Sequence, residues 1–131
     1  MCGVPGLRTV HGSLQFTITE QSAERVVSEL PITDGVRNPY GVVNAGAIVW
    51  FADVTATVLV LGHARPSEGM AGFPLAIHLG AHFLRNQTEG TLRAVSTYVR
   101  RGRSVSVVRT LVHGEHERLI ADITTSHVLA R

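Results

Sequence analysis

One apolar stretch limits what this chain can fold into more than any other feature. Residues 45–62, AGAIVWFADVTATVLVLG, form an 18-residue run in which Asp53 is the only charged side chain. Asn44, just before the run, is a residue type that caps helix N-termini, and Gly62 is a type that ends helices. The run therefore predicts one long helix over about 45–61.

This helix is expected to be buried on nearly every side. Apolar residues occupy almost all positions around its axis, which is typical of a helix wrapped by other elements. A membrane span is the alternative, but a carboxylate at the bilayer centre costs roughly 2.5–3.5 kcal/mol and basic flanks are weak. We therefore expect a wrapped helix and no membrane segment.

Six β-like runs accompany the helix. The runs 13–20 and 24–33 precede it and are expected to form an antiparallel pair, and the runs 74–84, 91–100, 103–113 and 117–129 follow it. Short separators rich in turn formers predict that the last four make an antiparallel meander with tight hairpins. One helix against one face of a single antiparallel sheet is an α+β architecture.

Length and charge limit the class of protein. A chain of 131 residues suits one domain, 1–131, and residues 1–11 are expected to be a mobile segment. Only 17% of residues are charged, which suggests that a partner chain covers part of the surface. The net charge of +2, from 12 basic residues that are all arginine, favours small anionic ligands over nucleic acid.

Cysteine and histidine positions exclude several site types. Cys2 is the only cysteine, so no disulfide can form within the chain, and a reducing cytoplasm is expected. The first residues contain no apolar core of signal-peptide length. His78 and His82 lie roughly 13 Å apart on a strand that rises about 3.3 Å per residue, too far to share an ion. We expect no metal and no cofactor.

Three segments together resemble a known family. NPYGVVNAGAIVWFAD running into the helix, then IHLGAHFLR and YVRRGRSVSVVRTLV, resemble the hotdog-fold acyl-CoA thioesterases of the phenylacetic-acid-degradation (PaaI-like) type over about residues 12–129. The resemblance implies an antiparallel sheet wrapped around one long central helix, an acyl-CoA substrate and a homodimer or dimer of dimers. The family's Asn, Gly, His-Gly-Gly and carboxylate fall on Asn38, Gly41, Asn44-Ala45-Gly46 and Asp53. Asn44 thus replaces His, and Ala45 replaces the first Gly of the pair.

The predicted chemistry uses a carboxylate and amide donors. Thioester hydrolysis needs a base or nucleophile, here Asp53, and donors for the oxyanion, here the backbone N–H groups of Ala45 and Gly46 at the helix start. Ala45 and Asp53 are eight residues apart, roughly 12 Å at about 1.5 Å rise per residue. One carbonyl cannot reach both, so the donors and the carboxylate are expected to come from different subunits.

Other residues are assigned around this pair. Asn38 supplies a side-chain amide or only caps a turn, and Asn44 caps the helix or also donates to the substrate. The substrate-binding set is expected to comprise Gly41, Trp50 and Thr57 near the acyl group and Arg85, Arg101 and Arg103 for the phosphates of coenzyme A. A solvated basic turn is the alternative for these arginines, and a hydrogen bond from Thr57 or the sheet is the alternative for Asp53.

Two other functions stay open. A hydratase or dehydratase acting on acyl thioesters needs a histidine base beside a carboxylate, and the NAG segment lacks one. A non-catalytic acyl-CoA binding or accessory protein would explain the changes at residues 44 and 45. The segment GHARPSEGMAGFP, residues 62–74, is expected to line the acyl pocket.

Overall fold

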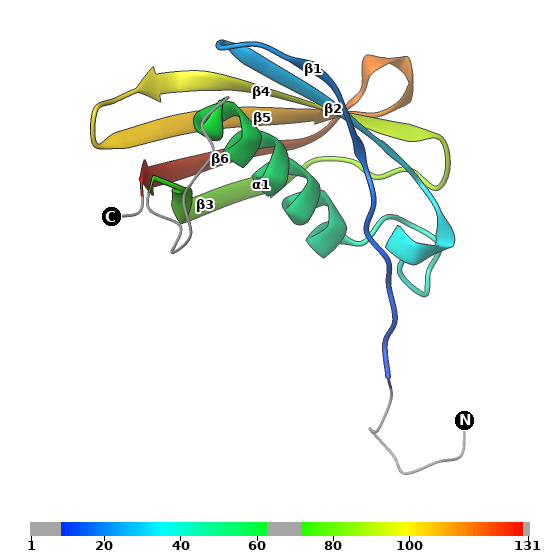
Figure 1. Ribbon diagram of the computed structural model, residues 1–131. Helices are drawn as coiled ribbons and strands as arrows, with labels where there is room; N and C mark the ends of the chain where they lie inside the picture. Colours follow the sequence, from blue (N-terminus) through cyan, green and yellow to red (C-terminus); the bar gives the residue numbers. More distant parts are fainter. Residues whose placement is uncertain (1–8, 63–71, 130–131) are drawn as a thin grey trace.

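A computed structural model describes residues 9–62 and 72–129 (Figure 1). Cys2, most of the N-terminal segment predicted to be mobile and residues 63–71 of the predicted acyl-pocket loop lie outside the described residues. The elements run in the order β1 (Thr17–Gln21), β2 (Arg25–Pro31), the 3-10 helix η1 (Asp34–Val36), α1 (Ala45–Leu61), β3 (Pro74–Phe83), β4 (Thr91–Arg101), β5 (Val105–His113), the 3-10 helix η2 (Glu115–Glu117) and β6 (Leu119–Leu129).

The helix begins and ends where its capping residues predict. Asn44 is extended, with φ −65° and ψ 131°, and its side chain accepts a hydrogen bond from the Gly46 amide. Gly62 has a φ of 61°, which favours glycine, and its N–H donates to the Val58 carbonyl. Both predicted ends of the helix are therefore confirmed.

The helix is buried along one side only, which corrects the expectation that it is buried nearly all round. The sheet covers the stripe that Ala47, Ile48, Phe51, Ala52, Thr55, Ala56 and Leu59 form, and these residues are buried. Trp50, Asp53 and Val54 are half-buried. The reason is geometric, since a single sheet reaches one side of a helix and leaves the opposite side to the solvent or to a partner.

The strands form one six-stranded antiparallel sheet in the order β1-β2-β4-β5-β6-β3, with α1 across one face (Figure 1). The predicted pairing of the first two strands and the hairpins β4–β5 and β5–β6 are confirmed. The predicted hairpin between β3 and β4 is wrong. Strands β2 and β5 occupy the two edges of β4, so β3 cannot pair with β4, and it pairs with the outer edge of β6.

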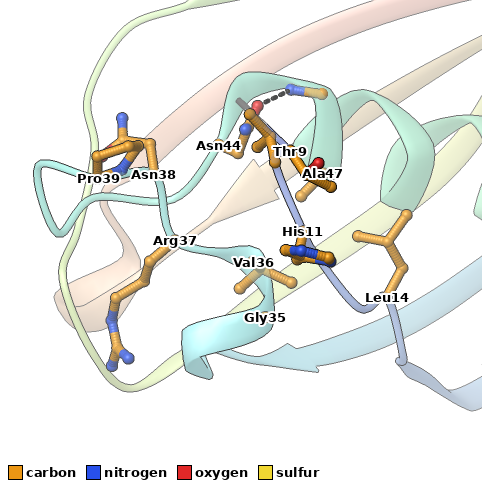
Figure 2. A pocket seen from close by; sticks show the side chains of 13 residues that line it. Thr9, His11, Leu14, Gly35, Val36, Arg37, Asn38, Pro39, Asn44 and Ala47 are labelled. Carbon is orange, nitrogen blue, oxygen red and sulfur yellow. Dashed lines mark hydrogen bonds between the residues drawn. The ribbon is translucent and has the colours of Figure 1, made fainter. Parts of the chain in front are cut away.

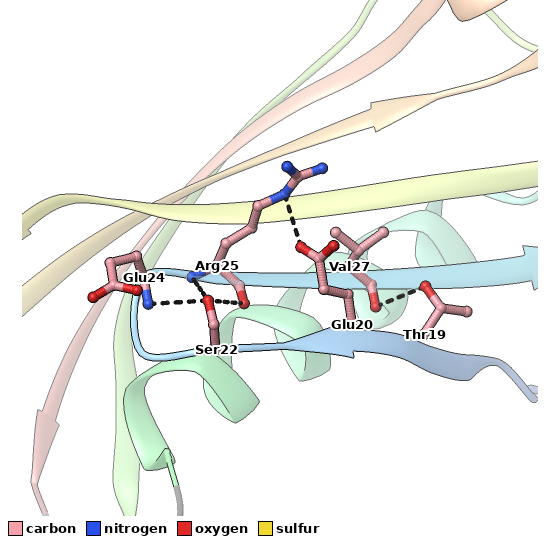
Figure 3. Close-up of polar contacts among 6 residues, drawn as sticks. All are labelled: Thr19, Glu20, Ser22, Glu24, Arg25 and Val27. Carbon is pink, nitrogen blue, oxygen red and sulfur yellow. Dashed lines mark hydrogen bonds and ion pairs between the residues drawn. The ribbon is translucent and has the colours of Figure 1, made fainter.

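The β1–β2 hairpin shows how the chain turns at the sheet edge (Figure 3). Ser22 holds the turn, because its hydroxyl accepts from the Arg25 amide at 3.1 Å while its own amide donates to the Arg25 carbonyl at 2.8 Å. Arg25 also pairs with Glu20 at 3.3 Å. The strand itself begins at Thr17, later than the predicted residue 13.

The residues before β1 leave the sheet for a physical reason. The Ser13 amide donates to the Gly35 carbonyl at 3.0 Å, which ties the segment to the loop before α1. Phe16 then packs edge-to-face against Trp50 and Phe51, with ring centroids 5.0 and 5.1 Å apart. The segment therefore lies over the helix and cannot extend the strand.

Two apolar clusters fix the helix on the sheet. The larger one packs the first half of α1, including Ile48 and Phe51, against Leu30, Leu92 and Ile123. The smaller one packs Ala56 and Leu59 against Val26 and Val108. A sheet folded around one long central helix is the predicted hotdog fold. Within the described ranges, no helix has both the length and the apolar character needed to cross a membrane.

Candidate active site

The start of α1 borders the first of two relevant cavities. This helix-start cavity has a volume of about 640 Å³ and is lined by Asn38, Asn44, Gly46 and Ala47 on one side (Figure 2). The segment 9–14 forms its other wall, from which His11 and Leu14 approach it. Three of the predicted catalytic residues thus meet in one place.

Asn38 combines a structural contact with a free donor. Its Oδ1 accepts hydrogen bonds from the amides of Tyr40 at 2.9 Å and Val42 at 3.3 Å, so the side chain does cap the turn. Its Nδ2 makes no hydrogen bond within the described residues. The oxygen of Asn38 therefore caps the turn, which was the alternative to a role in the site. The nitrogen remains available to a ligand in the cavity.

The helix-start amides differ from each other. The Gly46 N–H donates to Asn44 Oδ1 at 3.0 Å, and the Ala47 and Ile48 amides donate to the Asn44 carbonyl at 3.0 and 3.3 Å. The Ala45 N–H has no acceptor within the described residues. The Gly46 amide is therefore occupied by the side chain that caps the helix, and Asn44 satisfies a backbone donor as its structural alternative predicts.

Asn86 fixes the backbone that leads into the helix. Its Oδ1 accepts from the Val43 amide at 3.1 Å and its Nδ2 donates to the Val43 carbonyl at 3.0 Å. The side chain thus pairs with one residue as a neighbouring strand would. The Asn44 amide adds a bond to the Val36 carbonyl at 2.7 Å. These contacts hold the helix start in place relative to the sheet.

The second cavity contains the carboxylate. This carboxylate cavity has a volume of about 370 Å³ and is mostly apolar, with Asp53 and Thr57 as its polar residues. Phe73 and Pro74, the end of the predicted acyl-pocket loop, also line it. The remaining lining residues come from the second half of α1 and the start of β3: Val54, Val58, Leu61, Leu75 and Ala76.

The Asp53 carboxyl makes no hydrogen bond to Thr57 or to the sheet. Its Oδ1 is buried and has no partner within the described residues. Oδ2 is not buried in this way, so it is the oxygen that a ligand in the carboxylate cavity can reach. A carboxyl oxygen buried without a hydrogen-bond partner is costly, which suggests that something other than folding stability requires Asp53 here.

A buried histidine near Asp53 was missed by the sequence reasoning. His127 on β6 is 1% exposed, and its Nε2 lies 2.8 Å from Thr125 Oγ1. Burial lowers the pKa of His127, and the negative charge of Asp53 acts in the opposite direction. Side chains two residues apart on a strand point to the same face, so the spacing of His127 from Ile123 and Thr125 could have predicted that it faces inward.

The other predicted site residues lie apart from these cavities. Trp50 packs on Phe16 and lines neither of them. Gly41, with a φ of 88°, shapes the turn before the helix. Arg85 is exposed, and the remaining two arginines border a separate cavity of about 130 Å³ at the β4–β5 hairpin: Arg101 and Arg103. The helix-start and carboxylate cavities share no lining residue.

The fold and the carboxylate cavity define an enzyme of the hotdog class. Residues 40–121 match the thioesterase superfamily. The chain is also 29% identical over 112 residues, 86% of each chain, to the protein named "Putative esterase ComA2" of Bacillus subtilis (strain 168).

Solved structures agree in fold. A mutant of the thioesterase SAV0944 from Staphylococcus aureus subsp. aureus Mu50 has a TM-score of 0.80 and 21% identity, over 88% of this chain and 93% of that one. A mutant of a hypothetical thioesterase from Streptococcus pneumoniae TIGR4 has a TM-score of 0.80 and 17% identity, over 94% and 98%. The chain belongs to the thioesterase superfamily, and its enzyme class is thioester hydrolase, acting on a small-molecule thioester.

Proposed function

We propose that this protein is an acyl-CoA thioesterase of the PaaI-like type that hydrolyses a thioester to a free acid and coenzyme A. The observation that carries the proposal is the Asp53 carboxyl, which has no partner within the described residues and lines a mostly apolar cavity in a superfamily of thioesterases. The apolar walls suit an acyl chain, and the carboxyl supplies the reactive group. The reaction needs water and no cofactor.

Asp53 acts in one of two ways in this proposal. As a general base, its Oδ2 takes a proton from a water that attacks the thioester carbonyl. As a nucleophile, Oδ2 attacks the carbonyl itself, thiolate leaves, and water then opens the mixed anhydride. In both routes negative charge develops on the carbonyl oxygen and must meet donors.

The free Ala45 amide is the first oxyanion donor in this proposal. The Gly46 amide joins it when the Asn44 side chain turns away, and Asn38 Nδ2 adds a side-chain donor from the helix-start cavity, which Gly46 also lines. Eight residues of helix separate Ala45 from Asp53, about 12 Å. The donors for one substrate therefore come from one subunit and the carboxylate from its partner, which gives an isologous dimer two equal sites.

The free edge of β3 is the proposed contact between subunits. Strand β3 ends the sheet, and its side chains Leu75, Ile77 and Phe83 are 46%, 57% and 45% exposed. An exposed apolar edge strand is a hazard unless another chain covers it. Leu75 also lines the carboxylate cavity, so a subunit at this edge would complete the site. Two such dimers pairing further would give a tetramer.

Arginines are proposed to bind the phosphates of coenzyme A. Arg101 stacks over the Tyr98 ring with its guanidinium 5.4 Å from the ring centroid, which holds it at the β4–β5 hairpin. Arg103 lines the same small cavity, and Arg85 would add charge from the end of β3. The single cysteine builds no disulfide within the chain, which supports the cytoplasm as the location.

A panel of acyl-CoA thioesters with free-thiol detection tests this function. Wild type should release coenzyme A, and Asp53→Asn should lose orders of magnitude in turnover while it still folds. Asp34→Asn, at an exposed carboxylate, is the matched control. Hydration without thiol release would support a hydratase, and tight binding without turnover an accessory protein. Oxygen-18 in the protein after a single turnover in labelled water would identify Asp53 as the nucleophile.

A further inference from the structure

His127 is a buried imidazole whose second nitrogen has no partner. One ring nitrogen, Nε2, lies 2.8 Å from Thr125 Oγ1, while Nδ1 is buried and makes no hydrogen bond within the described residues. A buried polar atom left without a partner is destabilising and is uncommon in folded proteins. Nδ1 therefore calls for a partner that the fold alone does not provide.

The strand register brings His127 next to the carboxylate cavity. His127 lies opposite Ala76 on β3, and Ala76 lines that cavity together with Asp53. On the other side His127 lies opposite Ser106 on β5. The imidazole thus belongs to the part of the sheet that faces the middle of α1. The influence of the Asp53 charge on His127 is consistent with this closeness.

The two unpartnered atoms are chemically complementary. Burial lowers the pKa of His127 and so favours the neutral imidazole, which has one N–H donor and one acceptor. When the Thr125 hydroxyl donates to Nε2, the hydrogen of the ring lies on Nδ1. Nδ1–H is then a buried donor without an acceptor, and Asp53 Oδ1 is a buried acceptor without a donor.

We propose that His127 is a positioning residue that holds Asp53 Oδ1 from its Nδ1–H through one shared water, because the two atoms make no direct hydrogen bond in the structure. The bond fixes the rotation of the carboxyl, so that Oδ2 points into the carboxylate cavity toward the thioester. This inference rests on the proposed role of Asp53 in hydrolysis. It adds a site residue from β6, a strand that carries none of the site residues predicted from the sequence.

The surroundings of His127 favour the neutral form. Asp53 faces it from α1, and Ser106 from β5 and Ala76 from β3 carry no charge. On its other side the hairpin cavity of about 130 Å³ brings the positive charges of Arg101 and Arg103 to the same region. His127 itself lines this hairpin cavity, and its burial is the larger influence on the ring: burial lowers the pKa of His127 and so favours Nδ1–H as a neutral donor.

Kinetics of three variants test the proposal. His127→Leu should lower kcat about 10- to 100-fold with little change in KM, a loss typical of residues that orient a reactive group. His127→Asn should restore most of kcat, because its Nδ2 can take the place of Nδ1. His113→Leu is the matched control, since His113 Nδ1 is also buried without a partner but lies at the far end of β5. It should leave kcat unchanged.

Imidazole NMR gives a second readout that does not need a His127 variant. In wild type, nitrogen-15 spectra should show His127 as the neutral tautomer with hydrogen on Nδ1. In Asp53→Asn the Nδ1 signal should move and the pKa of His127 should fall, because the carboxylate that raises it is gone. Wild-type kcat in His127→Leu, or signals that Asp53→Asn does not move, would overturn the inference. Full activity in Asp53→Asn would instead remove the proposed function.

Discussion

Replacing Ala45 by proline removes one amide hydrogen and very little else. Ala45 is the first residue of α1, a position where proline is common because its φ suits the helix. The residue before a proline must be extended, and Asn44 already is, with ψ 131°. No hydrogen bond within the described residues is lost. We therefore expect the free energy of unfolding to change by less than about 0.5 kcal/mol.

The same change should be severe for catalysis. Loss of one oxyanion donor typically lowers kcat by about 10²–10³, or roughly 2.7–4 kcal/mol of transition-state stabilisation. Ala45→Gly keeps the amide and should stay within a few-fold of wild type. The assay is coenzyme A release at saturating substrate, together with urea unfolding of each variant.

Mixed dimers then show which subunit supplies each group. A dimer of one Ala45→Pro chain and one Asp53→Asn chain, isolated through two different affinity tags, has one site with both defects and one intact site if the sites are shared. It should retain about half of the wild-type activity. If both groups came from the same chain, every site would be defective and activity would stay near that of the single variants. That result, or wild-type kcat in a folded Ala45→Pro, would refute the two-subunit reasoning.

Three further predictions test other contacts. Arg101→Glu together with Arg103→Glu should raise KM for acyl-CoA more than it lowers kcat, and an unchanged KM would remove these arginines from phosphate binding. Asn86→Ala should lower the free energy of unfolding by about 1–3 kcal/mol in urea, since three hydrogen bonds from its side chain to the backbone of Val43 and Gln87 are lost, whereas Asn86→Asp should cost less. The hydrogen bond from Arg109 lowers the pKa of Asp122. The ion pair therefore stabilises the fold above the ordinary carboxyl pKa, and this stabilisation disappears as the pH falls through the lowered pKa. In Asp122→Asn the free energy of unfolding should depend less on pH in this acidic range.

The sequence predicted the helix and the strands better than their pairing. Asn44 and Gly62 mark the helix ends through local backbone chemistry, so both ends came out correctly. The neighbour of β3 depends on which strand edges are already occupied, and no residue of β3 encodes that. The predicted four-strand meander is therefore wrong only at the hairpin between β3 and β4.

Some features of the candidate site could be predicted from the sequence, and others depend on the folded structure. Asp53 stands out as the one charge in an apolar run, and the cavity around it agrees with that reading. The bond from the Gly46 amide to Asn44 depends on a side-chain rotamer, which spacing along the chain does not fix. His127 looks like any other residue of an alternating strand until the register places it opposite Ala76.

The position of β3 at the sheet edge also bears on the order of folding. Residues paired between β3 and β6 are between 38 and 55 positions apart, as for Phe83 with Ala121 and Pro74 with Leu129. Contacts that close long loops cost more chain entropy and tend to form late. The β4–β5–β6 hairpins close much shorter loops, so β3 should join a sheet that already exists. Since Pro74 also lines the carboxylate cavity, the wall beside Asp53 should form after the β4–β5–β6 hairpins, and the β3 amides should exchange their hydrogens before those of β5.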